Sequence, residues 1–132
     1  MKALFSITLI ILSFYSSLTH ATFECEEEVY NKDLINLTDS ILKNVLNRDG
    51  NSYESPLQLI DHKAPMYCGS HTYMGTSYSV VSVEVTVDEY ATETDSLYRV
   101  NDTCHISFTR NNNKWAGEQI SCYEELGIEA DL

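Results

Sequence analysis

Cysteine and histidine are the residues of this chain whose spacing could support metal chemistry. Cys68 and His71 are separated by two residues, and Cys104 is followed directly by His105. Two sulfur and two imidazole ligands could complete the tetrahedral coordination of zinc. Adjacent residues of a strand point to opposite faces of a sheet, however, so Cys104 and His105 cannot easily share one ion. We therefore expect no metal site.

Catalytic signatures are absent from the sequence. The segment GTSYS, residues 75–79, departs from the G-x-S-x-G nucleophile motif at its fifth position, Ser79. Carboxylates that could act in pairs on a glycosidic bond are numerous, and no pair stands out from the others. We expect a protein that is not an enzyme and that holds no cofactor.

The four cysteines are better explained as two disulfides. Three asparagines, residues 111–113, separate two strand-like runs, and asparagine favours turns because it tolerates positive φ. A hairpin centred on Asn113 places Cys104 opposite Cys122, within reach of a cross-strand disulfide. By exclusion, Cys25 pairs with Cys68. Four cysteines allow three pairings, and this hairpin register selects one of them.

The first 21 residues have the three-part build of a secretory signal peptide. A short positive start is followed by the apolar run ALFSITLIILSF and then by SSLTHA, in which Thr19 and Ala21 suit the positions before a cleavage site. The apolar run is shorter than the ~20 residues of a spanning helix, although an uncleaved anchor stays an alternative. We expect residues 1–21 to be removed and residues 22–132 to form a single domain, periplasmic in a bacterium and otherwise secreted.

The charge of the chain is strongly acidic. The 20 acidic and 8 basic residues give a formal net charge of −12, and loss of Lys2 with the signal peptide makes it −13. This charge argues against nucleic acid and anionic membrane surfaces as partners. It serves solubility alone, or it steers the protein toward a basic partner. On the second interpretation, Glu93 and Asp95 are candidate steering charges.

The pattern of apolar residues predicts an α+β fold. In residues 24–50, Leu34, Leu37, Ile41 and Val45 recur at helical spacing, which predicts one long N-terminal helix. After an irregular segment, the period changes to two, and alternating valines in 77–90 predict a strand with one polar face. Residues 96–110 and 114–122 continue an antiparallel sheet, and 66–75 is a candidate fourth strand. We expect the helix to pack on a curved sheet of three to four strands.

A partner-binding face is predicted on the polar side of the last hairpin. Trp115, Tyr123 and His105 share a parity with residues that are otherwise polar. Aromatic side chains on such a face are typical anchors for a protein partner. The alternative is that another strand, the C-terminal tail or a second subunit of a homodimer covers them.

The order of these elements resembles a cystatin-type fold, although the Q-x-V-x-G and Pro-Trp loops of cystatins are missing from the chain. In export, size, acidity and crosslinks the chain looks like small periplasmic immunity proteins of Gram-negative bacteria, including those directed against type VI secreted cell-wall hydrolases. It is also similar to periplasmic lysozyme inhibitors, whose own signatures are absent. The resemblance implies an immunity protein or inhibitor of a basic cell-wall-degrading enzyme. A secreted module that binds a small ligand on its sheet face is the second alternative, and a small hydrolase is the third.

Overall fold

The computed structural model describes residues 25–51 and 53–132, so the predicted signal peptide lies outside the described residues. In the described part of the chain, one helix is followed by six strands of an antiparallel sheet, and a very short strand precedes the helix. The elements are β1 (Glu27–Glu28), α2 (Lys32–Val45), β2 (Leu57–His62), β3 (Met66–Tyr73), β4 (Thr76–Ala91), β5 (Ser96–Asn111), β6 (Lys114–Cys122) and β7 (Ile128–Asp131).

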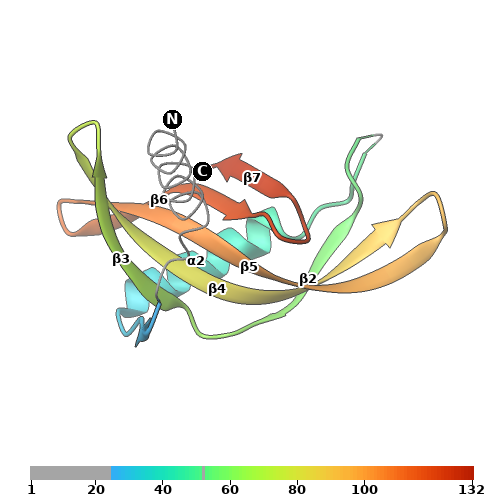
Figure 1. Ribbon diagram of the computed structural model, residues 1–132, viewed down its shortest axis with the longest axis horizontal. Coiled ribbons are helices and arrows are strands. Elements are labelled where there is room, and N and C mark those ends of the chain that lie inside the picture. The colour runs from blue at the N-terminus through green and yellow to red at the C-terminus, as the bar shows by residue number, and fades with distance from the viewer. Residues whose placement is uncertain (1–24, 52) are drawn as a thin grey trace, which may run out of the picture.

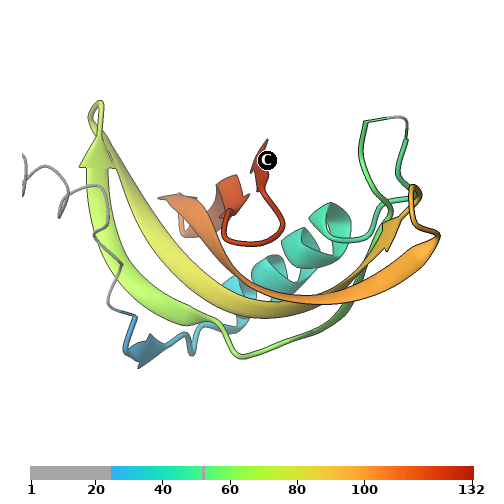
Figure 2. The same ribbon diagram turned by 45° about the vertical axis from the view of Figure 1, so that its right-hand side comes forward.

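The sheet has the strand order β1-β3-β4-β5-β6-β7, and β2 pairs with β4 beyond the end of β3. Strands β4 and β5 are 16 residues long each and pair without a register shift from Ser79–Phe108 to Ala91–Ser96. Figures 1 and 2 show that this long hairpin bends strongly and that α2 lies within its curve. The other strands extend the sheet on both sides of this hairpin, with β3 and β2 beside β4 and β6 beside β5.

The predicted long helix over residues 24–50 is wrong, because α2 has only 14 residues. Its N-cap is Asn31, whose side chain accepts a hydrogen bond from the backbone N–H of Leu34. Glu27 and Glu28 pair with β3, and the backbone N–H of Val29 donates to the carbonyl of Pro65. This part of the predicted helix is therefore held in extended form by the sheet.

The predicted sheet of three to four strands and its cystatin-like outline are also wrong, because the sheet has seven strands. The four expected strands correspond to β3, β4, β5 and β6. The three additional strands are short or irregular, and β2 carries a bulge between Leu59 and Asp61. Such short or bulged segments do not contain a continuous alternating pattern that could be recognised in the sequence. Their pairing is decided by the neighbouring strand. The described part of the chain is mainly an antiparallel sheet with one helix.

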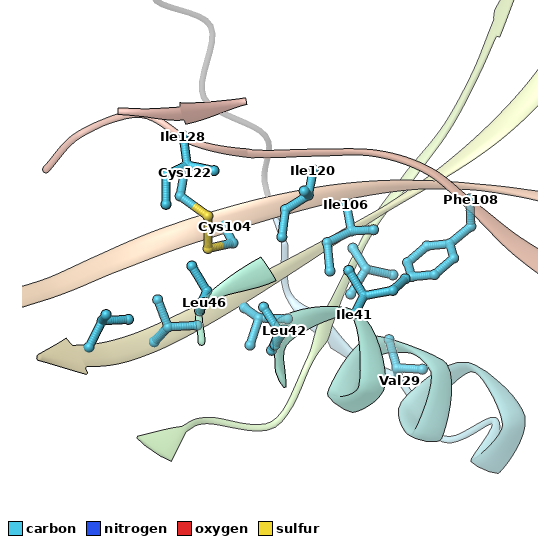
Figure 3. Close-up of a cluster of buried hydrophobic side chains, with 14 of the residues drawn as sticks. Val29, Ile41, Leu42, Leu46, Cys104, Ile106, Phe108, Ile120, Cys122 and Ile128 are labelled. Atoms are coloured by element: carbon cyan, nitrogen blue, oxygen red, sulfur yellow. A yellow bond between two sulfur atoms is a disulfide. The ribbon is translucent and has the colours of Figure 1, made fainter. Parts of the chain in front are cut away.

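The hydrophobic core lies between α2 and the concave face of the sheet. Leu42 and Leu46 from the helix end are fully buried in one cluster with Ile106 and Phe108 of β5 (Figure 3). The alternating valines of β4 point to the same side, as their period of two predicts. Thr38 is the buried polar residue of the helix, and its hydroxyl donates to the carbonyl of Leu34 at 2.7 Å. Its hydroxyl is thus satisfied within the core.

The β5–β6 hairpin turns at Asn112 and Asn113, both of which have positive φ, 50° and 64°. Two central residues with positive φ define a type I′ turn, whose twist suits an antiparallel hairpin. Asn111 pairs with Lys114, so the hairpin centre lies between Asn112 and Asn113 and not at Asn113. Residues close to the turn are consequently one position out of the predicted register.

A β-bulge restores the predicted register farther along the hairpin. Glu118 is the extra residue, since its neighbours Gly117 and Gln119 pair with adjacent residues of β5. Beyond the bulge Ile106 faces Ile120, as predicted. Because of this extra residue, odd-numbered side chains of β6 before the bulge point to the opposite face of the sheet from odd-numbered side chains after it.

Both predicted disulfides are present in the structure. Cys104 and Cys122 are joined across the β5–β6 pair, and both side chains are fully buried. Cys25 is joined to Cys68 and ties the chain before β1 to β3. Structural disulfides persist in oxidising compartments, so the two bonds indicate an extracytoplasmic environment. Within residues 25–51 and 53–132, no helix is long and apolar enough to cross a membrane.

Candidate binding surface

The polar side chains of the long strands form an outer face, which we define as the side of β4, β5 and β6 that points away from α2. Its residues alternate with the buried valines of β4 and with the buried Cys104 and Ile106 of β5. The directly opposed pairs on this face are Ser82 with His105, Glu84 with Thr103, Thr86 with Asn101, and Asp88 with Arg99.

His105 and Tyr123, two of the predicted partner-binding residues, lie on the outer face near Glu124 and Glu129. His105 is opposite Ser121, which in turn is opposite Glu129 of β7. Partial burial lowers the pKa of His105, against the opposing effect of the Glu124 carboxylate. The hydrogen bond with Glu129 raises the pKa of the exposed Tyr123 hydroxyl. The surroundings of both rings are therefore acidic.

A hollow of about 410 Å³ lies beside these residues on the outer face. Lys63 is one of the residues that line the hollow, and its ammonium group forms an ion pair with Glu84 at 2.6 Å. The backbone N–H of Lys63 donates to the Glu84 carbonyl. The lining is mixed polar and acidic and comprises Asp61, His62, Lys63, Glu84, Val85, Thr86, Asn101, Asp102, Thr103 and Glu124. Carboxylates beside hydroxyl and amide groups can accept hydrogen bonds from lysine or arginine side chains.

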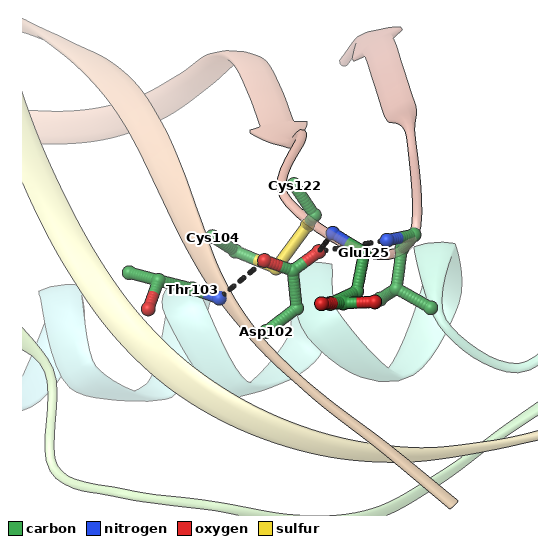
Figure 4. Close-up of a disulfide and its surroundings, with 6 residues drawn as sticks. Asp102, Thr103, Cys104, Cys122 and Glu125 are labelled. Carbon is green, nitrogen blue, oxygen red and sulfur yellow. Dashed lines mark hydrogen bonds between the residues drawn. A yellow bond between two sulfur atoms is a disulfide. The ribbon is translucent and has the colours of Figure 1, made fainter. Parts of the chain in front are cut away.

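Asp102 fixes the connection between β6 and β7, which carries Tyr123 and Glu124. Its side chain is only 5% exposed and accepts three backbone N–H groups (Figure 4). The donors are Thr103 at 2.7 Å, Glu125 at 3.1 Å and Leu126 at 2.9 Å. A carboxylate bound by backbone donors is a satisfied buried group, and here it holds the connection against β5.

Trp115 does not share the face of Tyr123 and His105, so the predicted grouping of these three residues is wrong. The bulge at Glu118 places Trp115 on the concave side, where it packs against the hydrophobic core. The guanidinium of Arg110 lies 5.2 Å from the centre of the indole ring. The indole Nε1 is buried and has no hydrogen-bond partner within the described residues. Whether Trp115 also contacts a partner stays a prediction.

Glu93 and Asp95 lie in the exposed turn between β4 and β5, at one end of the long hairpin. Asp95 has a φ of 49°, a conformation that aspartate tolerates in turns. Figures 1 and 2 show this turn and the β5–β6 turn next to Trp115 at opposite ends of the molecule. The structure therefore separates the predicted contact residues into an acidic turn, the central outer face, and a core-facing indole.

Sequence reasoning missed the part of the surface that β2 supplies. Asp61 and Lys63 reach the outer face because β2 pairs with β4 beyond the end of β3. The imidazole of His62 points to the other side, toward Asp39 of α2. The proline-bracketed segment 51–65, with its short apolar run LQLI, predicts an irregular connection with at most one short strand and does not indicate that pairing. In the described part of the chain, no group of three or more His, Cys, Asp or Glu side chains is placed to hold a metal ion.

A scan against protein-family models, a search of curated proteins and a search of solved structures each found no match to this chain.

Proposed function

We propose that the chain is an exported, acidic binding protein that neutralises a basic partner protein. The observation that carries the proposal is the number of carboxylates without a cationic neighbour. Of the 19 acidic residues in the described part of the chain, four form an ion pair there: Asp39, Glu54, Glu84 and Asp88. Negative charge that is not neutralised internally can attract a basic protein and accelerate its association.

We further propose that the partner is a cell-wall-degrading enzyme and that the protein acts as its immunity protein or inhibitor in the periplasm. The disulfides support a location outside the cytoplasm, where such enzymes act. Glu93 and Asp95 would steer the partner, and Tyr123 and His105 would contribute contact area on the outer face. Electrostatic steering sets mainly the association rate, whereas desolvated contacts set the dissociation rate.

A panel of purified basic muramidases and amidases tests this function. The clearing of a peptidoglycan suspension is followed with and without an equimolar amount of the oxidised protein, at low and at high salt. We expect inhibition of one enzyme class, with an association rate that falls as salt increases. Full activity of every enzyme, together with no binding detectable by calorimetry, would contradict the proposal.

A further inference from the structure

Half of strand β5 has an open edge. Strand β4 pairs with β5 as far as Ser96, whereas β6 ends at Cys122, opposite Cys104. The connection after β6 is bound to Asp102, so among the described residues no strand pairs with Ser96–Asn101 on the side away from β4. Figure 1 shows this part of β5 extending past β6 and β7.

The backbone groups on this edge follow from the disulfide. Cys104 and Cys122 have a Cα–Cα distance of 4.3 Å, which is typical of a non-hydrogen-bonded antiparallel pair. The backbone N–H and C=O groups of Cys104 therefore point toward β4. Because the β4–β5 pairing has no register shift, those of Leu97, Arg99 and Asn101 point away from β4. The edge presents three N–H and three C=O groups at regular spacing.

This edge lacks most of the features that normally prevent strand addition. Natural sheets protect their edges with proline, charged side chains, bulges or very short strands. Residues 96–101, SLYRVN, contain no proline or lysine and follow the pairing without a bulge, and their one charged side chain, Arg99, is ion-paired with Asp88 of β4. Leu97 and Tyr98 are 65% and 50% exposed.

The other open stretches in the described part of the sheet include β7, the part of β3 beyond Tyr67, residues 114–117 of β6 and the outer edge of β2. Both β2 and the β3–β4 pairing contain a bulge or irregularity, and β7 has four residues.

The charges around the edge select the kind of segment that could add to it. Glu93 and Asp95 lie in the turn before Ser96, and Glu124 and Glu125 lie in the connection held by Asp102 at the other end. An antiparallel pairing of two copies through these edges would bring the acidic ends of one copy close to those of the other. Like charges disfavour that pairing, whereas a cationic segment would meet carboxylates at both of its ends.

We propose that the Ser96–Asn101 edge of β5 binds an extended, cationic segment of the partner protein by strand addition. This inference rests on the proposed function and names the part of the partner that the protein recognises. Main-chain hydrogen bonds to Leu97, Arg99 and Asn101 provide affinity, and the flanking carboxylates provide the preference for lysine and arginine. The outer-face residues then contact the body of the partner.

A pair of peptides tests the edge without knowledge of the natural partner. The probe is an eight-residue peptide of alternating lysine and threonine with blocked ends. The control has the same sequence and charge, but all its backbone nitrogens are methylated, so that it cannot donate in a ladder. At low salt the probe should slow hydrogen exchange of the Leu97, Arg99 and Asn101 amides by about tenfold and bind about tenfold more tightly than the control.

Two substitutions at one position provide a second test. Leu97→Pro removes an N–H that points away from β4, which an edge position tolerates, and it should weaken probe binding by about tenfold. Leu97→Thr removes the exposed apolar side chain but keeps the N–H, and it should change affinity less than about threefold. Circular dichroism verifies that both variants are folded. The exchange measurement on the unmodified chain decides the matter if Leu97→Pro does not fold.

The outcomes separate this inference from the proposed function. Equal binding of the two peptides would overturn strand addition, and inhibition in the hydrolase panel would then still support a basic partner. Absence of probe binding at low salt would overturn it as well. Protection of the same three amides without peptide, together with a dimeric mass in sedimentation, would assign the edge to a second copy and overturn the inference. If no hydrolase is inhibited while the probe protects the edge, the proposed enzyme class fails and the edge assignment stands.

Discussion

The imidazole of His62 lies 2.8 Å from the carboxylate of Asp39 and thereby ties β2 to α2. Its other ring nitrogen, Nδ1, lies 2.9 Å from the carbonyl of Lys63. Both ring nitrogens therefore face acceptors, an arrangement that a doubly protonated ring satisfies best. Lys43 also contacts Asp39, at 2.8 Å, from the next turn of the helix.

This contact predicts a pH-dependent contribution to stability. Partial burial lowers the pKa of His62, but the hydrogen bonds to Asp39 and to the Lys63 carbonyl outweigh it, so the pKa is raised above 6.5. The contribution is complete below about pH 6.5 and is lost as pH rises through the folded-state pKa. Hydrogen bonds from Lys43 and His62 lower the pKa of Asp39, so its contribution is lost only in acid, below about pH 4.

We expect His62→Gln to lower the free energy of unfolding by less than about 1 kcal/mol at pH 5.5 and by a smaller amount at pH 8.5. Urea unfolding at the two pH values measures the difference. His71→Gln is the matched control, because His71 is exposed and stacks on Tyr78, and no carboxylate among the residues that the structure describes pairs with it. An equal loss of stability at both pH values for His62→Gln would contradict the expected pH dependence.

Asp102→Ala is expected to loosen the connection between β6 and β7. The change leaves the N–H groups of Thr103, Glu125 and Leu126 without their acceptor and should lower the free energy of unfolding by about 2–3 kcal/mol. Hydrogen exchange should accelerate first at Glu125 and Leu126. Asp49→Ala removes the same charge from an exposed position and should have little effect on stability. Unchanged exchange at Glu125 would exclude this role for Asp102.

The two disulfides should be recovered by peptide mapping of the oxidised protein as Cys104–Cys122 and Cys25–Cys68. They close sequence separations of 18 and 43 residues, so replacing each pair by alanine should cost about 3 and 4 kcal/mol in the chain-entropy model. Chemical denaturation of the two double variants measures these costs. A peptide that joins Cys25 to Cys104 or to Cys122 would be incompatible with the β5–β6 register.

Gly117 allows β6 to approach the helix closely. A Cβ atom at this position would lie 2.6 Å from Cδ1 of Ile41 and 3.0 Å from Cδ1 of Leu132. Gly117→Ala should therefore destabilise the fold by about 1–2 kcal/mol through overpacking. Ile41→Val removes the closest atom, so the double variant should lose less stability than the sum of the two single variants. Strict additivity of the two changes would show that the helix does not press on this position.

Glu93→Lys and Asp95→Asn should slow association with the basic partner, because both side chains lie in the acidic turn next to the open edge of β5. We expect a decrease of the association rate constant by about threefold at low salt, with little change in the dissociation rate. Asn is chosen at position 95 because it tolerates the positive φ of this residue. Glu27→Lys makes the same change as Glu93→Lys on β1, at the other end of the sheet, and serves as the control. If the variants and the unmodified protein associate at the same rate at every salt concentration, the acidic residues serve solubility and do not steer the partner.

Several features could be predicted from the sequence because local patterns determine them. The alternation of valines in β4 follows from the two-residue period of a half-buried strand. The asparagine run indicated the β5–β6 turn because few residues accept positive φ. From that turn, the register at Cys104 and Cys122 and both disulfides could be derived.

Other features were decided only by tertiary structure. The start of α2 at Lys32 depends on pairing of the preceding residues with β3, which overrides the helical preference of a glutamate-rich segment. Trp115 faces the core and not the predicted outer face, because the bulge at Glu118 gives the residues before it the opposite orientation to the one that the Cys104–Cys122 register predicts. The open edge at Ser96–Asn101 exists because β4 and β5 continue where β6 ends. Strand lengths and partners are set by long-range pairing, and no local pattern in residues 96–101 distinguishes an edge from a paired strand.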